Sequence, residues 1–272
     1  MFEELFAPLP DAGKYLERMG LGPIAKPDRE TLDRIVLAHL RTVPFENLDV
    51  YDADEDILLD PVSLYGKIVT RRRGGYCFEL NAALTALLRA LGYDCYAVAS
   101  RVVWFGDDGH APLTHQGIVV TIDGTRYFCD VGFGGPMPYG AVLLDSREEQ
   151  QTGPDVYKVI EKGEDLLLGR VLPDRFEATL RFSPKPVDPV DFLALNEYQS
   201  RSKNSWFRKQ RLLNLGTEGG SLSITGNVLK IHDKGEVTEV TLKNEEEIKK
   251  AMREWFGIVV DFPLKRDWEE EK

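Results

Sequence analysis

The sequence has few cysteines and no long apolar run, and both absences limit what the protein can be. Its three cysteines, Cys77, Cys95 and Cys129, form no CxxC pair and are odd in number. A disulfide framework or a cysteine-rich zinc site is therefore not expected, and a reducing cytoplasm fits best. No stretch approaches the roughly 18 to 20 apolar residues of a membrane span. The first residues, MFEELFAPLP, lack the basic-then-apolar order of a signal peptide.

Positive charge is also in short supply. The 34 lysines and arginines are outnumbered by 45 aspartates and glutamates, which gives a net charge of −11. Such a balance argues against general nucleic-acid binding and against a basic membrane-binding surface. The 272 residues, 43% of them hydrophobic, are typical of a globular protein with two or three packed units.

The spacing of apolar residues predicts helices first and strands later. Helices are expected over 28–40, from Asp60-Pro61 onward, and over 77–90, with Gly92 as the stop. Short strands separated by Gly and Asp turns predict a small antiparallel barrel, over 97–104, 117–122, 127–131, 156–161, 166–172 and 176–182. A further helix is expected from Asp188-Pro189. A second strand group then leads to a last helix over 244–256 and a tail, EEEK, expected to fray.

The stretch RRRGGYCFELN, residues 71–81, has a cysteine where the chain has just turned and a helix begins. A thiol near a helix N-terminus lies close to partial positive charge and unpaired amides, which favours the thiolate and supplies donors for an oxyanion. Gly74 and Gly75 allow a sharp turn before Cys77, and three arginines add positive charge. Cys77 is therefore a candidate nucleophile, although most free cysteines are simply buried.

A candidate base and its orienting group lie in the stretch THQGIVVTIDGTRYFCDVGFGG, residues 114–135. Asp123-Gly124 predicts a two-residue hairpin turn, in which Ile122 faces Thr125 and paired positions sum to 247. This register puts His115 and Asp130 on one face of the hairpin as diagonal neighbours, and a slip of one residue would separate them. Cys77, His115 and Asp130 would then form a nucleophile, base and orienting carboxylate. The alternative is an ordinary strand-end histidine and a turn aspartate.

The remaining histidines and cysteines have simpler interpretations. His39 is expected in the core, His232 beside a turn, and His110 in a polar loop, where it is the alternative base. Cys95 and Cys129 are expected to be core or strand residues. No set of histidines and carboxylates has a spacing that predicts a metal site.

With these motifs in view, the chain resembles the arylamine N-acetyltransferases. RGGYCFELN resembles the family's nucleophile motif, THQGIVV its histidine segment and DVGFGG its aspartate segment. RTVPFENLDV, residues 41–50, and KYLERMGL near the start resemble two further signatures, and the order and spacing agree with the family throughout. The resemblance covers most of the first half of the chain.

The resemblance implies an α+β fold of three domains with a papain-like Cys-His-Asp site. A helical bundle over 1–91 would carry Cys77, an antiparallel β-barrel over 92–185 would carry His115 and Asp130, and an interdomain helix with an α/β lid would occupy 186–272. It also implies a ping-pong reaction, in which acetyl-CoA acetylates Cys77 and an arylamine, hydrazine or arylhydroxylamine then takes the acetyl group. A thiol suits this chemistry because a thiolate is both a good nucleophile and a good leaving group.

Binding residues are implied with less detail. Phe45 and Phe133 are candidates for lining an aromatic acceptor pocket, with core packing as the alternative for each. Thr114, Tyr198 and Asn204 are candidate CoA contacts. The segment 196–212 departs from the family, because it lacks a proline in the run Ser200–Ser205. It nevertheless contains five basic residues that either attract CoA phosphates or form a solvated face, namely Arg201, Lys203, Arg208, Lys209 and Arg211.

Three other functions compete with this assignment. A related acyltransferase that forms an amide in a biosynthetic pathway would use the same triad with a different acyl donor. A thiol hydrolase also sets a helix-start cysteine against a sheet histidine, and a non-enzymatic binding module would leave Cys77 with ordinary reactivity. The sequence leaves open the physiological amine, the acyl chain and the oligomeric state, a homodimer included.

Overall fold

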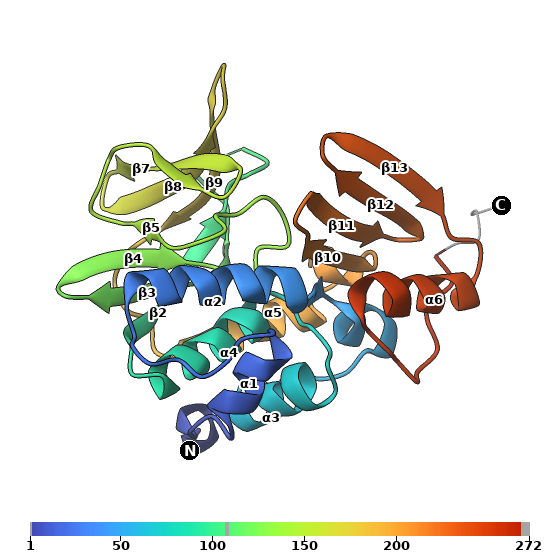
Figure 1. Cartoon of the computed structure of the whole chain (residues 1–272). Coiled ribbons are helices and arrows are strands. Elements are labelled where there is room, and N and C mark those ends of the chain that lie inside the picture. The colour runs from blue at the N-terminus through green and yellow to red at the C-terminus, as the bar shows by residue number, and fades with distance from the viewer. Residues whose placement is uncertain (1, 107–108, 268–272) are drawn as a thin grey trace.

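The computed structural model of the chain describes residues 2–106 and 109–267. The tail from residue 268, where fraying is expected, lies outside the described residues. Helices gather in the first part of the chain, a β-barrel follows, and a second sheet with its own helix forms the C-terminal part (Figure 1). Within residues 2–106 and 109–267, none of the helices has both the length and the apolar character that crossing a bilayer requires.

The first part of the chain is helical because capped segments turn apolar faces toward a common core. In α2 (Arg29–Thr42), the Asp28 Oδ1 accepts a hydrogen bond of 3.0 Å from the Thr31 backbone N–H. Helix α4 (Cys77–Ala90) has the boundaries expected from the sequence and is buried on most sides. The other helical segments here are η1 (Glu3–Phe6), α1 (Ala12–Arg18), η2 (Asp49–Ala53), α3 (Pro61–Tyr65) and η3 (Gly66–Thr70).

The middle of the chain folds into the expected antiparallel barrel. Its eight strands have the order β5-β4-β3-β2-β9-β8-β7-β6. They span β2 (Asp94–Val102), β3 (Leu113–Ile122), β4 (Thr125–Cys129), β5 (Val142–Leu143), β6 (Gln150–Thr152), β7 (Asp155–Lys162), β8 (Asp165–Val171) and β9 (Phe176–Phe182). The Gln150 side chain in β6 bonds both the N–H and the C=O of Leu143 in β5, at 2.7 and 2.9 Å. This contact brings the two edge strands together, so the barrel is nearly closed.

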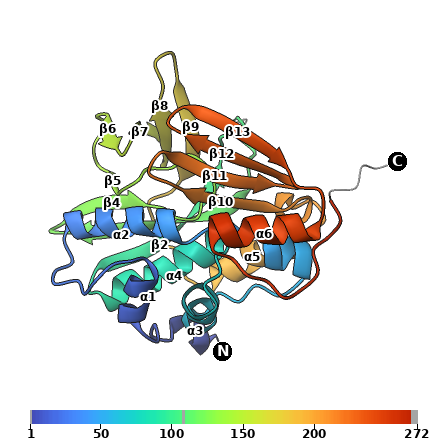
Figure 2. The same cartoon turned by 45° about the vertical axis from the view of Figure 1, so that its right-hand side comes forward.

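The C-terminal part forms a second antiparallel sheet of order β1-β10-β11-β12-β13. Its strands are β1 (Phe45–Glu46), β10 (Leu212–Gly216), β11 (Gly220–Thr225), β12 (Val228–Asp233) and β13 (Glu236–Thr241). The expected last helix is α6 (Glu245–Phe256), which is capped by the Asn244 side chain and packs apolar residues on one face of this sheet (Figures 1 and 2). Strand β1 comes from the segment expected to belong to the first domain, so this sheet joins distant parts of the chain.

Helix α5 (Asp191–Arg201) and the short η4 (Trp206–Arg208) connect the barrel to this second sheet. The helix expected from Asp188-Pro189 begins two residues later, at Asp191. Asp188 Oδ1 instead accepts a hydrogen bond from the Val190 N–H at 3.0 Å, which stabilises a turn before the helix. The reason is that an aspartate followed by proline caps a turn as readily as a helix.

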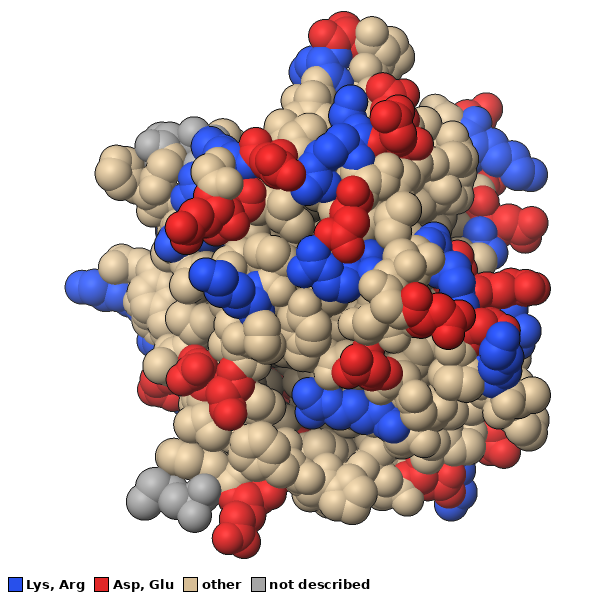
Figure 3. Space-filling model, turned by 90° about the vertical axis from the view of Figure 1, so that its left-hand side faces the viewer, with Lys and Arg blue, Asp and Glu red and all other residues tan. Residues whose placement is uncertain are grey.

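Charged side chains of both signs are interspersed on the face of the molecule shown in Figure 3. Among the described residues, ion pairs with solvent-accessible side chains include those between Arg126 and Asp145 and between Arg147 and Glu161. Such pairs contribute little to stability because water already solvates both charges.

A buried arginine fastens the C-terminal part to the helical part. The Arg211 side chain is fully buried, and its guanidinium donates to the Asp52 carboxylate at 2.6 and 3.0 Å and to Asp267 at 2.8 Å. Asp52 also accepts a hydrogen bond from the Lys265 N–H at 2.8 Å. A buried charge is tolerated only when its donors and acceptors are satisfied, so this cluster fixes how the segments meet.

Replacing Arg211 with alanine is expected to destabilise the protein by about 3–5 kcal/mol, because Asp52 stays buried without its counter-ion. Arg208→Ala is the matched control, since Arg208 pairs with the exposed Asp54 and its loss is expected to cost about 1 kcal/mol or less. Urea unfolding of both variants measures the difference. Equal losses in the two variants would contradict the assigned role of Arg211.

Candidate active site

Cys77 is the first residue of α4 and is buried, with 2% of its surface exposed. The two glycines before it serve close packing. A Cβ on Gly74 would lie 1.8 Å from the Pro44 carbonyl oxygen, and one on Gly75 would lie 2.8 Å from the Glu79 side chain. Neither glycine has a positive φ, so the expected sharp turn is not the reason for them. Gly74 thus allows the chain before Cys77 to run against the segment that forms β1.

The hairpin register expected from the sequence is confirmed. Ile122 pairs with Thr125 and Ile118 with Cys129, so paired positions sum to 247. His115 is near the start of β3, and Asp130 directly follows β4. Both are buried, and His115 Nε2 lies 2.5 Å from Asp130 Oδ2. The ladder between β3 and β4 ends before His115, which is paired with Ser100 of β2 instead.

The electrostatics of His115 favour the imidazolium. Burial opposes the charged form, but the adjacent Asp130 carboxylate and a contact with Cys77 outweigh it and raise the pKa of His115 to about 10. Because Asp130 occupies Nε2, the nitrogen available toward Cys77 is Nδ1. The Cys77 Sγ also lies 3.6 Å from the Thr114 carbonyl oxygen, directly before the histidine.

Asn81 is a site residue that the sequence analysis missed. It lies one turn after Cys77 on α4 and is fully buried. Its Nδ2 donates to Asp130 Oδ1 at 2.8 Å and to the Gln116 carbonyl at 2.6 Å, while its Oδ1 accepts from the Val131 N–H at 3.0 Å. Asn81 thus joins the helix that carries the thiol to both strands of the hairpin. Its spacing of four residues from Cys77 is the signal that could have indicated it.

Gly132 explains why the hairpin can approach so closely. A Cβ there would lie 2.7 Å from the Cys77 Cα, and its N–H donates to Asp130 Oδ1 at 2.7 Å. The glycine-rich run after Asp130 therefore packs against the backbone of Cys77. No side chain larger than hydrogen fits at this position without displacing α4.

The expected positive charge from the three arginines before Cys77 is mostly absent. Arg71 and Arg72 are exposed, whereas Arg73 is buried and its Nη2 lies 2.8 Å from Glu46 and 2.5 Å from Asp49. The two carboxylates neutralise this guanidinium. Sequence adjacency overstated the charge because it could not show the partners that folding supplies.

A second buried cation joins the same cluster. Lys67 Nζ lies 2.6 Å from Glu79 and 2.7 Å from Asp49. Glu79 in turn accepts the Tyr76 N–H at 3.0 Å, which caps the first turn of α4. Burial raises the pKa of Glu79 to about 7 despite the opposing effect of Lys67. The cluster therefore anchors the helix that begins at Cys77.

A cavity of about 470 Å³ opens beside Cys77 and His115. Phe45, Phe133 and Thr114, all named from the sequence, line it. Phe133 packs edge-on against His115, with ring centroids 5.8 Å apart. Lining residues that the sequence analysis did not name include four more aromatic or polar groups, namely Trp104, Phe105, Trp206 and Gln199. Phe105 and Trp206 are 89% and 56% exposed, so the mouth of the cavity is aromatic.

Tyr198 and Asn204 do not belong to the described lining of this cavity, and both are exposed. The basic cluster expected around them is largely paired. Arg201 and Arg208 bind Asp54, while Arg211 is buried, and only the two lysines of the set are exposed without a carboxylate partner among the described residues. Neither expected alternative, a phosphate-attracting patch or a solvated basic face, describes this segment as a whole.

The other titratable candidates lie elsewhere. His39 is buried in the core and bonds the Tyr15 hydroxyl at 3.0 Å, and burial lowers the pKa of His39 to about 3. His110 and His232 are exposed. Cys95 and Cys129 are buried as expected. No group of three His, Cys, Asp or Glu side chains that could hold a metal ion occurs in the described part of the chain.

Comparisons with known proteins agree on one family. A sequence model of the N-acetyltransferase family matches residues 28–265. An arylamine N-acetyltransferase of Mycolicibacterium smegmatis is 32% identical over 91% of this chain and 92% of its own. The arylamine N-acetyltransferase structure from Salmonella typhimurium superposes with a TM-score of 0.88 at 27% identity, covering 94% and 93% of the two chains. The Mycobacterium marinum arylamine N-acetyltransferase in complex with CoA has a TM-score of 0.85 at 30% identity, covering 91% and 93%.

Asn81→Ala is expected to lower kcat/KM on the order of 100-fold, because the Asp130 carboxylate and with it the His115 ring lose their alignment. Thr85→Val is the matched control on the same helix, since the Thr85 hydroxyl donates to the Asn81 main-chain carbonyl oxygen, at 2.7 Å, and does not touch the Asn81 side-chain amide. Steady-state kinetics of the two variants, with circular dichroism to verify folding, measure the effect. Equal kcat/KM in the two variants would show that Asn81 does not position Asp130 and His115.

The raised pKa of His115 also predicts a pH dependence of stability. Above about pH 6.5 the unfolded state loses a proton that the native state keeps until about pH 10. Within this window the contribution of His115 to the free energy of unfolding should fall by about 1.4 kcal/mol per pH unit. Denaturant unfolding at several pH values, compared between wild type and His115→Asn, isolates that slope. Parallel curves for the two proteins would refute the assignment.

Proposed function

The chain belongs to the arylamine N-acetyltransferase family, a family of acyltransferases, and we propose that it moves an acetyl group through Cys77 in two half-reactions. The observation that carries this proposal is the contact between a helix-start thiol and an imidazole whose other nitrogen is held by Asp130, at a cavity with aromatic walls. The donor is acetyl-CoA. The acceptors are arylamines, hydrazines or arylhydroxylamines.

In the first half-reaction, the Cys77 thiolate attacks the thioester carbonyl carbon of acetyl-CoA. A new carbon–sulfur bond forms to Sγ, the bond to the CoA sulfur breaks, and the departing thiolate takes the proton held on His115 Nδ1. Backbone N–H groups in the first turn of α4 have no partner within the helix and are suited to stabilise the oxyanion. The raised pKa of His115 supports this step, because it favours an imidazolium beside the thiolate.

In the second half-reaction, the amine nitrogen attacks the acetyl carbon on Cys77. His115 Nδ1 accepts the proton that the amine loses, and the thiolate leaves to restore the starting state. Asp130 keeps the ring oriented and stabilises its positive charge without itself taking the proton. A thioester on a buried cysteine is protected from bulk water, which favours transfer to the amine over hydrolysis.

The two substrates would share the cavity beside Cys77. Phe45 and Phe133 supply flat apolar walls for an aromatic amine, and their position on the cavity supports this role. For the CoA thioester we propose Thr114, Tyr198 and Asn204 as contacts. Of these Thr114 has the best support, because it lies on the cavity next to His115.

We also propose that the chain is organised as a helical unit over 1–91, a barrel unit over 92–185 and a lid unit over 186–272. The thiol would come from the first unit and the His-Asp pair from the second. The lid would bound the cavity through residues of β10 and β11, which line it. Strand β1 would tie the lid to the first unit.

Intact-protein mass spectrometry after brief incubation with acetyl-CoA tests the proposal. Wild type is expected to gain one acetyl group and to lose it when an aminobenzoate is added. Cys77→Ser is expected to gain none, because an alcohol at this position is far less ionised than a thiol. Cys95→Ser is the matched control and should behave as wild type does.

Three other outcomes would each change the assignment. An adduct lost equally fast without amine would indicate a thiol hydrolase. No adduct from acetyl-CoA but one from a different acyl donor would indicate an acyltransferase of another pathway. A Cys77 that reacts with none of the donors would leave only a non-enzymatic function.

A further inference from the structure

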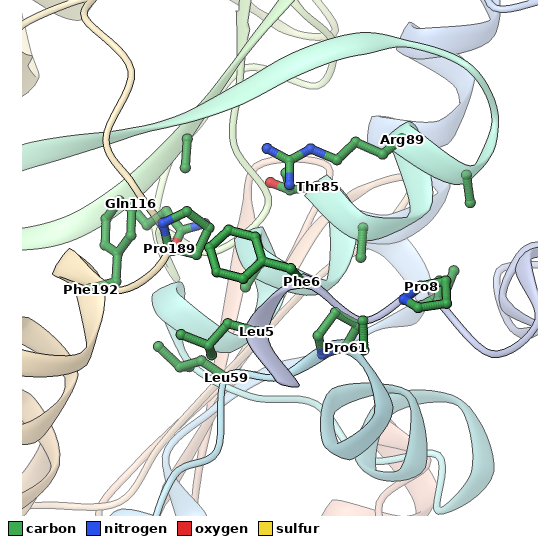
Figure 4. A pocket seen from close by; sticks show the side chains of 16 residues that line it. Leu5, Phe6, Pro8, Leu59, Pro61, Thr85, Arg89, Gln116, Pro189 and Phe192 are labelled. Carbon is green, nitrogen blue, oxygen red and sulfur yellow. The ribbon is translucent and has the colours of Figure 1, made fainter. Parts of the chain in front are cut away.

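A second cavity lies behind the helix that carries the nucleophile. It has a volume of about 360 Å³ and is bounded by the N-terminal segment, α4, β2 and the start of α5. Figure 4 shows its side chains, among which Phe6, Pro8, Pro61, Pro189 and Phe192 are apolar. None of its lining residues belongs to the cavity beside Cys77. We call it the rear cavity.

Most of the rear cavity is lined by apolar groups, and one face of α4 forms its wall. Ala82, Thr85, Ala86, Arg89 and Ala90 follow the helical spacing of three and four residues. From Ala82 to Arg89 the helix rises roughly 10 Å. The wall that α4 contributes therefore extends about this far along the helix axis.

A neutral hydrogen-bonding group marks one end of this cavity. The Gln116 side chain lines this end of the cavity, and only 3% of the residue's surface is exposed. The Gln116 main-chain carbonyl is bonded by Asn81, but its side-chain amide has no hydrogen-bond partner among the described residues. The amide atoms are not among the fully enclosed polar atoms, so they can be reached from the cavity. An amide has both donor and acceptor groups, so a neutral polar group of a ligand can hydrogen-bond it there.

The positively charged Arg89 lies at the other end of the rear cavity. Arg89 is exposed at the rim of the cavity. Among residues 2–106 and 109–267, its side chain makes a single hydrogen bond, of 3.5 Å to the Cys95 carbonyl oxygen. Within the same residues no carboxylate lies within ion-pair distance of Arg89. In a protein of net charge −11, an arginine without a carboxylate beside an apolar cavity is suited to bind an anion.

From these three features we propose that the rear cavity binds an elongated organic carboxylate. Its apolar chain would lie along α4, its carboxylate would pair with Arg89, and a hydroxyl or similar neutral group at the far end would bond the Gln116 amide. The ligand is thus an unbranched ω-hydroxy acid or a close chemical relative. It is neither of the substrates proposed for the Cys77 site.

The rear cavity adjoins the site through shared residues. Gln116 follows His115 in β3 and its carbonyl accepts a hydrogen bond from Asn81, which holds Asp130. Thr85 bonds the Asn81 carbonyl from the cavity wall. A ligand in the rear cavity would therefore contact both elements that position the His-Asp pair, and its binding should change acetyl transfer.

Isothermal titration of the full chain with 8-hydroxyoctanoate tests the proposal. Arg89→Gln is expected to weaken binding about tenfold, as the loss of one charge-assisted hydrogen bond predicts. Arg34→Gln is the matched control, because Arg34 is an exposed helical arginine that does not line the cavity, and it should leave binding unchanged. Octan-1-ol, which lacks the carboxylate, should bind about as weakly to wild type as 8-hydroxyoctanoate binds to Arg89→Gln.

Two further variants test the cavity itself. Ala86→Leu fills the space beside α4 and should abolish binding while the melting temperature and the acetylation of Cys77 stay normal. Gln116→Leu should erase any preference for 8-hydroxyoctanoate over octanoate, because the amide is gone and the main-chain carbonyl remains.

The proposal is overturned by either of two results. These are no binding to wild type, and equal binding to wild type and Ala86→Leu. The second result would show that the probe binds outside the rear cavity.

Discussion

A buried carboxylate must be surrounded by donors, and the structure around the site follows from how Asp130 meets that requirement. It is 2% exposed and takes hydrogen bonds from His115, from Asn81 and from the Gly132 N–H. These donors come from β3, from α4 and from the loop after β4. Because an unpaired buried carboxylate would be costly, the three segments can meet in only one arrangement. That arrangement brings His115 to the thiol of Cys77.

Buried charges are also satisfied by partners in a second cluster, at the start of α4. Lys67 and Arg73 are enclosed by Glu46, Asp49 and Glu79, all buried. Glu46 belongs to β1 and Glu79 to α4, so this cluster aligns the second sheet with the helix that begins at Cys77. The helix thus has one charged anchor on each side, which makes it a rigid support for a reactive group.

The two cavities lie on opposite sides of that helix and differ in character. The cavity beside Cys77 has aromatic walls drawn from the helical part, the barrel and the second sheet. The rear cavity is lined mainly by small apolar groups of α4 and the N-terminal segment, with polar groups at its ends. Asn81 and Gln116 connect the two, because both touch the His-Asp pair or its neighbours. A ligand or substitution in either cavity is therefore expected to affect how the Asp130 carboxylate is held.

Local chemistry in the sequence was enough to predict several features. The boundaries of α4, the cap of α2 by Asp28 and the pairing of Ile122 with Thr125 depend on neighbouring residues, and all three were correct. Extended past the end of the ladder, that register predicted His115 and Asp130 as neighbours, and the structure brings them into contact. Only the tertiary structure decided the rest, since burial and partners come from segments far apart in the chain. It neutralised Arg73 through Glu46 and Asp49, made Asn81 the link to Asp130 and left the Gln116 amide facing a cavity.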